Sequence, residues 1–299
     1  SGLSSAKGRK KTTMALLDDN QMRSISPFFG TPFGRFAGDV LKKLLALDDF
    51  IDTYETSAEG GALGPDFAYN VMKVTGADYM VSGFDTLRKL AGGPFITISN
   101  HPYGGVDGLI NVDLVGHLYQ DYKVIVNKIL GYLEAMGPSF IEVTPTGEER
   151  TAPTKDSISG IRLALQHLHE GHPLGIFPSG AVSDLSLRDR CIRDREWQDA
   201  IIRVIKKARV PVVPIRYFDG NSLFYYLLGL ISWKIRILRL PKEVINKGGK
   251  TIRVGIGDII SVEEQEKYTD INEFRDFLRH SVYDMPLPDN FVKRSELII

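Results

Sequence analysis

Short runs of apolar, β-branched residues alternate through the middle of the chain with stretches in which apolar residues recur at helical spacing. The short runs predict strands at about residues 94–99, 122–127, 139–144, 173–177 and 210–216. The helical stretches between them fall at about residues 109–120, 129–136, 156–170 and 196–208. Because strands that alternate with helices pair mostly in parallel, we expect an α/β fold with a central, mainly parallel mixed sheet flanked by helices.

The segments before and after this region have different patterns. Basic residues crowd residues 1–13, which we expect to be a disordered leader or a tag remnant. We expect residues 14–79 to be an N-terminal helical segment with helices at about 40–47 and 66–75. The α/β domain spans residues 80–261, after a short strand that begins around residue 79. A C-terminal helix and tail occupy residues 262–299, where Asp270 and Glu273 form a capping box for a helix that ends near Tyr283.

Amino-acid composition excludes some classes of protein but does not indicate which reaction, if any, the protein catalyses. Lysine plus arginine balances aspartate plus glutamate, and this net charge of zero argues against a general nucleic-acid binder. Apolar residues make up 43% of the 299 residues, which is enough for a sizeable core. Cys191 is the only cysteine, so an internal disulfide and a cysteine-based metal site are excluded, and a reducing compartment fits.

The candidate chemistry follows the strand predicted at 94–99. Residues 99–108 read Ser-Asn-His-Pro-Tyr-Gly-Gly-Val-Asp-Gly, which places His101 and Asp107 on a glycine-rich loop between a strand and a helix. A carboxylate can orient an imidazole and stabilise its charged form, as a general base requires. On a regular helix, residues six apart would point about 240° apart, but glycines permit other backbone angles. The alternative is an ordinary turn in which the histidine caps a carbonyl.

The loop carries a resemblance to a known family. Asn100-His101 followed by Asp107 resembles the first signature block of the glycerolipid (lysophosphatidic acid) acyltransferase superfamily. The spacing is one residue longer than the usual pattern, and this form is similar to the haemolysin-like, ornithine-lipid-type branch. Three further segments, at residues 137–143, 175–180 and 210–215, resemble later blocks in the family's order. Val143 stands where the family has an arginine for the acceptor's phosphate, and Ser179 replaces a glutamate.

The resemblance implies a catalytic pair, His101 and Asp107, together with residues that would bind substrate. These substrate-binding candidates are Asn100, Gly104, Gly105, Lys128, Phe177, Pro178, Ser179, Gly180 and Arg188. Lys128, Arg150 and Lys155 are nearby basic residues that could substitute for the missing arginine. Backbone N–H groups of Gly104, Gly105 or Gly180 are candidate donors to an oxyanion.

The implied reaction is transfer of a fatty acyl group from a thioester, acyl carrier protein or coenzyme A, to the hydroxyl of a lyso-lipid. The acceptor would be a lyso-phospholipid or a lyso form of an amino-acid lipid. The reaction calls for no cofactor besides that co-substrate and no metal. His167, His169 and His172 straddle a predicted helix end and have no neighbouring cysteine, which argues against a metal site there. Two alternatives stay open: a lipid or acyl-thioester hydrolase that uses the same pair, and a non-enzymatic, haemolysin-like membrane-binding protein.

Two segments are candidate membrane contacts. The most apolar run, residues 223–233, is followed by basic residues that include Lys234, Arg236 and Arg239, and this combination suits an anionic bilayer. The alternative is a buried helix and strand with a solvated basic face. An aromatic segment at 28–36, followed by a helix at about 40–47, is the second candidate. No stretch has the roughly 18 apolar residues of a membrane span, so we expect a cytoplasmic protein on the inner membrane face.

Overall fold

A computed structural model describes residues 47–90, 92–143, 155–231 and 233–299. The predicted leader at 1–13 and the aromatic segment at 28–36 lie outside the described residues, as does Arg150. Only the last residue of the helix predicted at 40–47 is described. Among the described residues, no helix is both long enough and apolar enough to cross a membrane.

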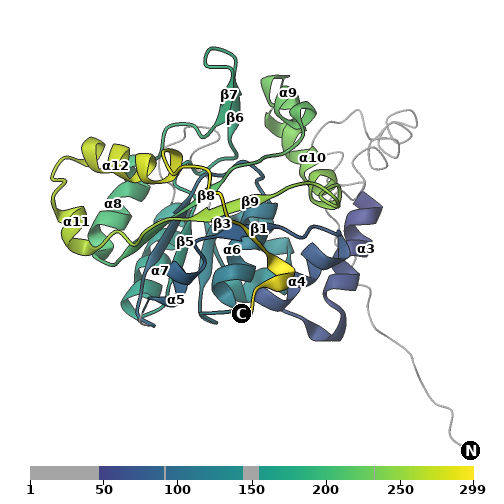
Figure 1. Cartoon of the computed structure of the whole chain (residues 1–299), viewed down its shortest axis with the longest axis horizontal. Helices are drawn as coiled ribbons and strands as arrows, with labels where there is room; N and C mark the ends of the chain where they lie inside the picture. The colour runs from purple at the N-terminus through teal and green to yellow at the C-terminus, as the bar shows by residue number, and fades with distance from the viewer. Residues whose placement is uncertain (1–46, 91, 144–154, 232) are drawn as a thin grey trace, which may run out of the picture.

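Eight strands of the described chain form one sheet (Figure 1). In spatial order they are β10 (Val292–Lys293), β1 (Met80–Ser82), β9 (Arg253–Ile256), β8 (Val212–Tyr217), β2 (Ile96–Ser99), β5 (Leu174–Ile176), β3 (Lys123–Asn127) and β4 (Phe140–Val143). The pairs β1–β9, β2–β8, β2–β5, β3–β5 and β3–β4 are parallel, whereas β8–β9 and β1–β10 are antiparallel. The mainly parallel mixed sheet confirms the predicted fold class, and the five predicted strands correspond to β2, β3, β4, β5 and β8.

Helices cover both faces of the sheet because successive strand residues point to opposite sides. The helices are α3 (Leu47–Ser57), α4 (Gly64–Val74), α5 (Asp85–Arg88), α6 (Val106–Gly116), α7 (Lys155–His169), α8 (Asp199–Ala208), α9 (Leu223–Ile231), α10 (Trp233–Ile245), α11 (Val262–Glu266) and α12 (Ile271–Tyr283). Residues of α4, α5 and α6 share one core with Val213 and Ile215 of β8. Residues of α7, α8 and α12 share the other core with Ile96 and Ile98 of β2.

Short irregular elements account for two differences from the predicted helices. The helix predicted at 129–136 consists instead of 3-10 turns, η3 (Lys128–Tyr132) and η4 (Glu134–Ser139), and Pro138 inside η4 cannot support a regular α-helix. Helix α6 begins at Val106 rather than near residue 109, so Asp107 lies in the first helical turn. Two more 3-10 turns are η2 (Glu59–Gly61) and η5 (Arg294–Glu296).

A small structural unit projects from one end of the sheet (Figure 1). It consists of the antiparallel hairpin β6 (Asp184–Ser186) and β7 (Cys191–Arg193) together with α9 and α10. Tyr225 and Tyr226 of α9 pack with Val182 in a separate apolar cluster beneath it. The alternative of a buried helix and strand is therefore wrong in its second element, because α9 and α10 are both helices, and contact of this run with a membrane stays a prediction.

Two of the three basic residues predicted to contact a membrane, Arg236 and Arg239, are engaged with groups of the protein. Arg236 is only 1% exposed, and its guanidinium binds the Asp184 carboxylate at 2.5 Å and the Ser183 carbonyl at 3.2 Å. The Arg239 guanidinium lies over the Phe224 ring and 3.4 Å from the Glu243 carboxylate. These charges are satisfied within the protein, so Arg236 cannot contact a membrane. The side chain of Lys234 lies outside the described residues.

Candidate active site

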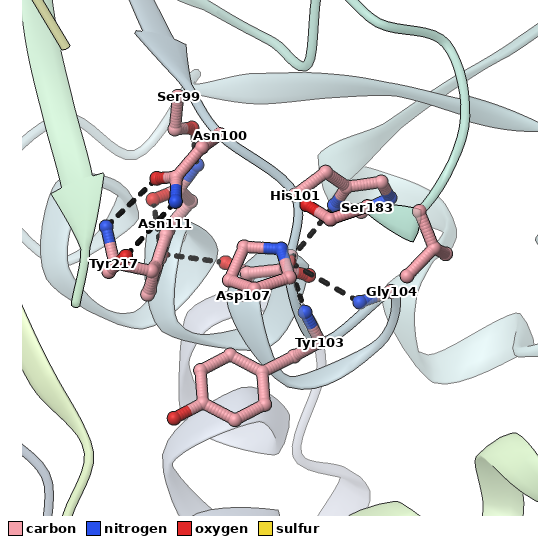
Figure 2. Close-up of polar contacts among 12 residues, drawn as sticks. Ser99, Asn100, His101, Tyr103, Gly104, Asp107, Asn111, Ser183 and Tyr217 are labelled. Carbon is pink, nitrogen blue, oxygen red and sulfur yellow. Dashed lines mark hydrogen bonds and ion pairs between the residues drawn. The ribbon is translucent and has the colours of Figure 1, made fainter. Parts of the chain in front are cut away.

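The His101 and Asp107 side chains meet at the end of β2, on the edge where the parallel strands end (Figure 2). His101 Nδ1 lies 2.9 Å from Asp107 Oδ2. The chain can turn between them because Gly104 adopts φ +79°. A β-carbon at Gly104 would also lie 2.7 Å from Val182 Cγ2, so any other residue would have to displace that side chain as well as adopt an unfavourable backbone angle.

The Asp107 carboxylate is fully buried and is held by four hydrogen-bond donors. Its Oδ2 accepts from His101 Nδ1 and from the backbone N–H groups of Tyr103 at 3.0 Å and Gly104 at 3.2 Å. Its Oδ1 accepts from the Gly108 N–H at 2.9 Å. Since a buried carboxylate needs such donors to remain charged, the first turn of α6 and the glycine loop together provide a fixed negative charge beside the imidazole.

The His101 ring is restrained on its second side as well. The Phe177 ring stacks on it with centroids 4.0 Å apart and planes inclined by 29°. Because an ionised carboxylate only accepts hydrogen bonds, we assign the Nδ1 hydrogen to the contact with Asp107, and Nε2 then carries a lone pair in the neutral ring. In the part of the chain that the structure describes, Nε2 has no hydrogen-bond partner, and the side chain is 15% exposed.

Charge around the ring favours its protonated form. Burial disfavours the imidazolium, but the adjacent Asp107 carboxylate and then the Asp194 carboxylate favour it more strongly, so the pKa of His101 lies above its usual value of 6.5. The His101 ring is therefore mostly neutral, and able to accept a proton, only at pH values above that raised pKa. A group of this kind can take up a proton at Nε2 and hold the resulting charge.

A second carboxylate, Asp194, supports the main chain of His101, and the sequence analysis missed it. Asp194 Oδ1 accepts from the His101 backbone N–H at 3.1 Å and from the Ser183 hydroxyl at 2.6 Å. Its Oδ2 accepts from Trp197 Nε1 at 3.0 Å. Burial raises the pKa of Asp194 despite these donors. Asp194 lies between two arginines in the sequence, which is the pattern of a solvated charge, so only the fold reveals its position.

Asn100, a predicted substrate-binding residue, joins the end of β2 to β8, and its contact with substrate stays a prediction. Its side-chain amide donates to the Tyr217 carbonyl at 2.9 Å and accepts from the Tyr217 N–H at 2.8 Å. The Tyr217 hydroxyl in turn donates to the Asn111 side chain at 2.6 Å and lies 2.9 Å from the Asp107 carbonyl (Figure 2). Asn100 is buried, and these hydrogen bonds fix the start of the loop against β8.

The segment 177–180 forms a tight turn after β5. The buried Ser179 hydroxyl donates to the Ala181 carbonyl at 2.7 Å, and the Pro178 carbonyl accepts from the Gln198 N–H at 3.0 Å. The Gly180 N–H donates to the Phe177 carbonyl at 3.0 Å. Of this segment, the structure brings Phe177 into contact with His101, whereas the polar groups of Ser179 and Gly180 are engaged within the turn.

The remaining predicted residues lie apart from the pair or are already engaged. The Gly104 N–H binds Asp107, so neither it nor the Gly180 N–H is a free oxyanion donor, and Gly105 is the remaining candidate at the N-cap of α6. Lys128 is exposed at the start of η3, just beyond the end of β3. Arg188 is exposed at the tip of the β6–β7 hairpin. The side chain of Lys155 lies outside the described residues.

The fold and the site together define an α/β protein in which a buried carboxylate orients a histidine ring at the carboxyl edge of the sheet, where proteins of this class bind ligands. The chain belongs to the acyltransferase family, whose model matches residues 35–289. This match confirms the resemblance inferred from the sequence blocks and identifies the protein as an acyltransferase. Membership of the haemolysin-like branch stays a prediction.

Two curated proteins, both named lyso-glycine lipid O-acyltransferase, are similar over most of their length. The protein from Bacteroides thetaiotaomicron is 27% identical over 281 residues, which is 91% of this chain and 98% of the relative. The protein from Phocaeicola vulgatus is 25% identical over 258 residues, which is 84% of this chain and 88% of the relative. A solved structure, the 1-acyl-sn-glycerophosphate acyltransferase PlsC from Thermotoga maritima, matches with TM-score 0.45 and 13% identity over 89% of this chain and 92% of that chain.

Proposed function

We propose that the protein is a lipid O-acyltransferase that moves a fatty acyl group from acyl carrier protein or coenzyme A to the hydroxyl of a lyso amino-acid lipid. The observation that carries this proposal is the His101–Asp107 contact of 2.9 Å, which leaves Nε2 without a partner among the described residues. Family membership supplies the reaction type. The names of the two relatives favour an amino-acid lipid as the acceptor.

In the proposed reaction, His101 Nε2 removes the proton of the acceptor hydroxyl as its oxygen attacks the thioester carbonyl. A new C–O bond forms, and the carbonyl oxygen becomes an oxyanion. When the oxyanion collapses, the C–S bond breaks and the departing thiolate takes the proton from the imidazolium. The products are the acylated lipid and the free thiol, and His101 returns to its neutral form.

Asp107 acts on this reaction through the ring. Its carboxylate fixes the Nδ1 hydrogen, orients Nε2 and stabilises the imidazolium that forms after proton transfer. General-base catalysis contributes about a hundred- to ten-thousandfold in rate. Positioning of the two substrates and stabilisation of the oxyanion supply the rest.

The sequence differs from the family pattern at a position that bears on which acceptor is preferred. Val143 occupies the position at which the resemblance places a phosphate-binding arginine, and it ends strand β4. An acceptor without a phosphate has no need of that arginine. This favours a lyso amino-acid lipid over a lyso-phospholipid.

The test is an assay of the purified protein with an acyl thioester and each acceptor in turn. Lyso-glycine lipid, lysophosphatidic acid and no acceptor are compared, and mass spectrometry detects the acylated lipid, the free fatty acid and the thiol. The proposal predicts acylated glycine lipid in excess over diacyl phosphatidate. Free fatty acid formed equally with and without acceptor would identify a hydrolase instead. Vesicle leakage without any acyl product would identify a haemolysin-like protein.

A further inference from the structure

Helix α9 presents an apolar face to solvent. Residues on one side of it are exposed, at i, i+4, i+7 and i+8 spacing from its first residue: Leu223, Leu227, Leu230 and Ile231, with Phe224 beside them. Ile231 is 76% exposed and Leu223 61%, whereas Tyr225 and Tyr226 on the opposite side are buried. Monomeric proteins rarely leave several large apolar side chains exposed together, and such a patch marks an interaction surface.

Cationic groups lie beside this face, on the β6–β7 hairpin. The hairpin and α9 rise together at one end of the molecule, and α9 packs against β6 (Figure 1). At the hairpin tip, Leu187 is 68% exposed, and its chain neighbours Arg188 and Arg190 are exposed as well. Neither of these arginines forms an ion pair with a carboxylate in the described parts of the chain, whereas Arg193 of β7 and Arg195, just after it, pair with Asp189 and Asp184.

The same helix is attached to the catalytic loop. The Tyr226 hydroxyl donates to the carbonyl of Pro102, the residue after His101, at 2.7 Å. The Asn221 side chain, just before α9, donates to the Tyr103 carbonyl at 2.9 Å. A surface that holds the outer side of α9 therefore also holds the loop that carries the general base.

We infer that the outer face of α9 and the hairpin tip form a docking surface for an anionic lipid bilayer, and this inference rests on the proposed function because a lipid acceptor resides in a bilayer. The apolar side chains enter the acyl region and the two arginines meet acidic headgroups. Docking brings the His101 loop to the layer where the acceptor hydroxyl lies. Arg188, predicted to bind substrate, then binds the membrane surface instead.

Sedimentation with vesicles tests the surface. The full chain and its variants are mixed with phosphatidylglycerol–phosphatidylcholine vesicles or with phosphatidylcholine alone, at low and high salt. The apolar variant is Leu227→Asn/Leu230→Asn/Ile231→Asn. Its matched control, Leu63→Asn/Leu163→Asn/Leu287→Asn, changes three side chains of similar exposure, 53%, 52% and 53%, elsewhere on the molecule. The charge variant is Arg188→Glu/Arg190→Glu, with Arg203→Glu/Lys207→Glu on exposed positions of α8 as its control.

The proposal predicts that the apolar variant lowers vesicle binding by about tenfold or more at both salt concentrations. The charge variant lowers binding to anionic vesicles by about tenfold at low salt, and salt abolishes the difference. Both controls bind like the wild type. Acyl transfer to detergent-dispersed lyso-lipid is unchanged in the apolar variant, whereas transfer to vesicle-embedded lyso-lipid falls with binding.

Other results would overturn the docking surface while leaving the proposed function intact. These are wild-type protein that transfers acyl groups without binding vesicles, or an apolar variant that pellets as well as the wild type. A wild-type dimer in solution that the apolar variant converts to a monomer, without vesicle binding by either, would assign the face to a second copy. Conversely, variant-sensitive vesicle binding without any acyl transfer would support the surface and contradict the proposed function.

Discussion

The backbone N–H of His101 donates to the buried Asp194 carboxylate over 3.1 Å, while its ring donates to the Asp107 carboxylate over 2.9 Å. Two carboxylates from distant parts of the chain thus hold the same histidine. Asp107 fixes the ring, and Asp194 fixes the main chain from which the ring projects. The hydrogen bond to Asp194 also joins the loop after β2 to the segment after β7.

Asp194→Asn should weaken both stability and activity. Both Asp194 oxygens accept hydrogen bonds, from the His101 N–H and from Trp197 Nε1, and an asparagine would place an NH₂ group against one of these donors. Leaving that buried donor unpaired costs about 1–3 kcal/mol. We expect the rate of acyl transfer to fall by about ten- to hundredfold because the ring is displaced. Asp189→Asn, on the exposed hairpin, is the control. Denaturant unfolding and kcat measure the two effects, and an unchanged kcat would contradict the positioning by Asp194.

Loss of the Arg294 guanidinium should destabilise the fold without changing the chemistry. Arg294 donates to both oxygens of the buried Asp113 carboxylate, at 2.9 and 2.8 Å, and the Tyr79 hydroxyl donates to the same group at 2.5 Å. Arg294→Met leaves that carboxylate short of a partner, for a loss of about 3–5 kcal/mol in the free energy of unfolding. Lys293→Met, at the exposed neighbour, should be neutral. Equal denaturation midpoints would contradict this assignment.

Stability should decrease with rising pH through His117. The hydrogen bond from its ring to the Asp113 carboxylate, with a second contact to Asp66, raises the pKa of His117 above 6.5. The folded state binds the proton more tightly than the unfolded state. This stabilisation is complete below pH 6.5 and is lost as pH rises through the folded pKa. Unfolding free energies of wild type and His117→Gln should therefore converge toward alkaline pH, and a constant difference would contradict the pairing.

Cys191→Ser should leave both activity and stability close to those of wild type. Cys191 is half-buried at the start of β7, opposite Ser186 in the hairpin, and the proposed reaction passes no acyl group to it. The expected change in unfolding free energy is within about 0.5 kcal/mol. Mass spectrometry of the protein after reaction with acyl thioester checks the point. An acyl adduct on Cys191, together with an inactive serine variant, would replace the direct route with a covalent one.

The middle of the sheet could be predicted from the sequence because β2, β5 and most of β8 are buried on both faces. The apolar residues at the start of β8, Val212, Val213 and Ile215, do not alternate with polar ones, which is the pattern of a parallel strand beneath helices. The antiparallel strand β9, inserted between β8 and β1, has no such local pattern. Its place depends on pairing across the sheet.

The site could be predicted in part. His101 and Asp107 could be predicted as a pair because they lie six residues apart on one glycine-rich loop, which lets the chain turn between them. The motifs do not reveal that the Asn100 and Ser179 side chains form hydrogen bonds with backbone carbonyl groups, because from the sequence either side chain could face a substrate. Arg236 looks solvent-exposed among other basic residues, and only the fold brings Asp184 to it. The contacts of Asn100 with Tyr217 and of Arg236 with Asp184 join residues more than fifty positions apart, which local patterns do not encode.

The pH dependence of kcat/KM for acyl transfer tests the central claim that His101, held by Asp107, is the general base. Because the Asp107 carboxylate raises the pKa of His101 above 6.5, activity of the wild type should fall on the acid side of a pKa above that value. Asp107→Asn should move this limb to lower pH and remove most of the activity. Folded His101→Gln should lose about a hundred- to ten-thousandfold. Folded His101→Gln with the rate and pH profile of the wild type would contradict the account.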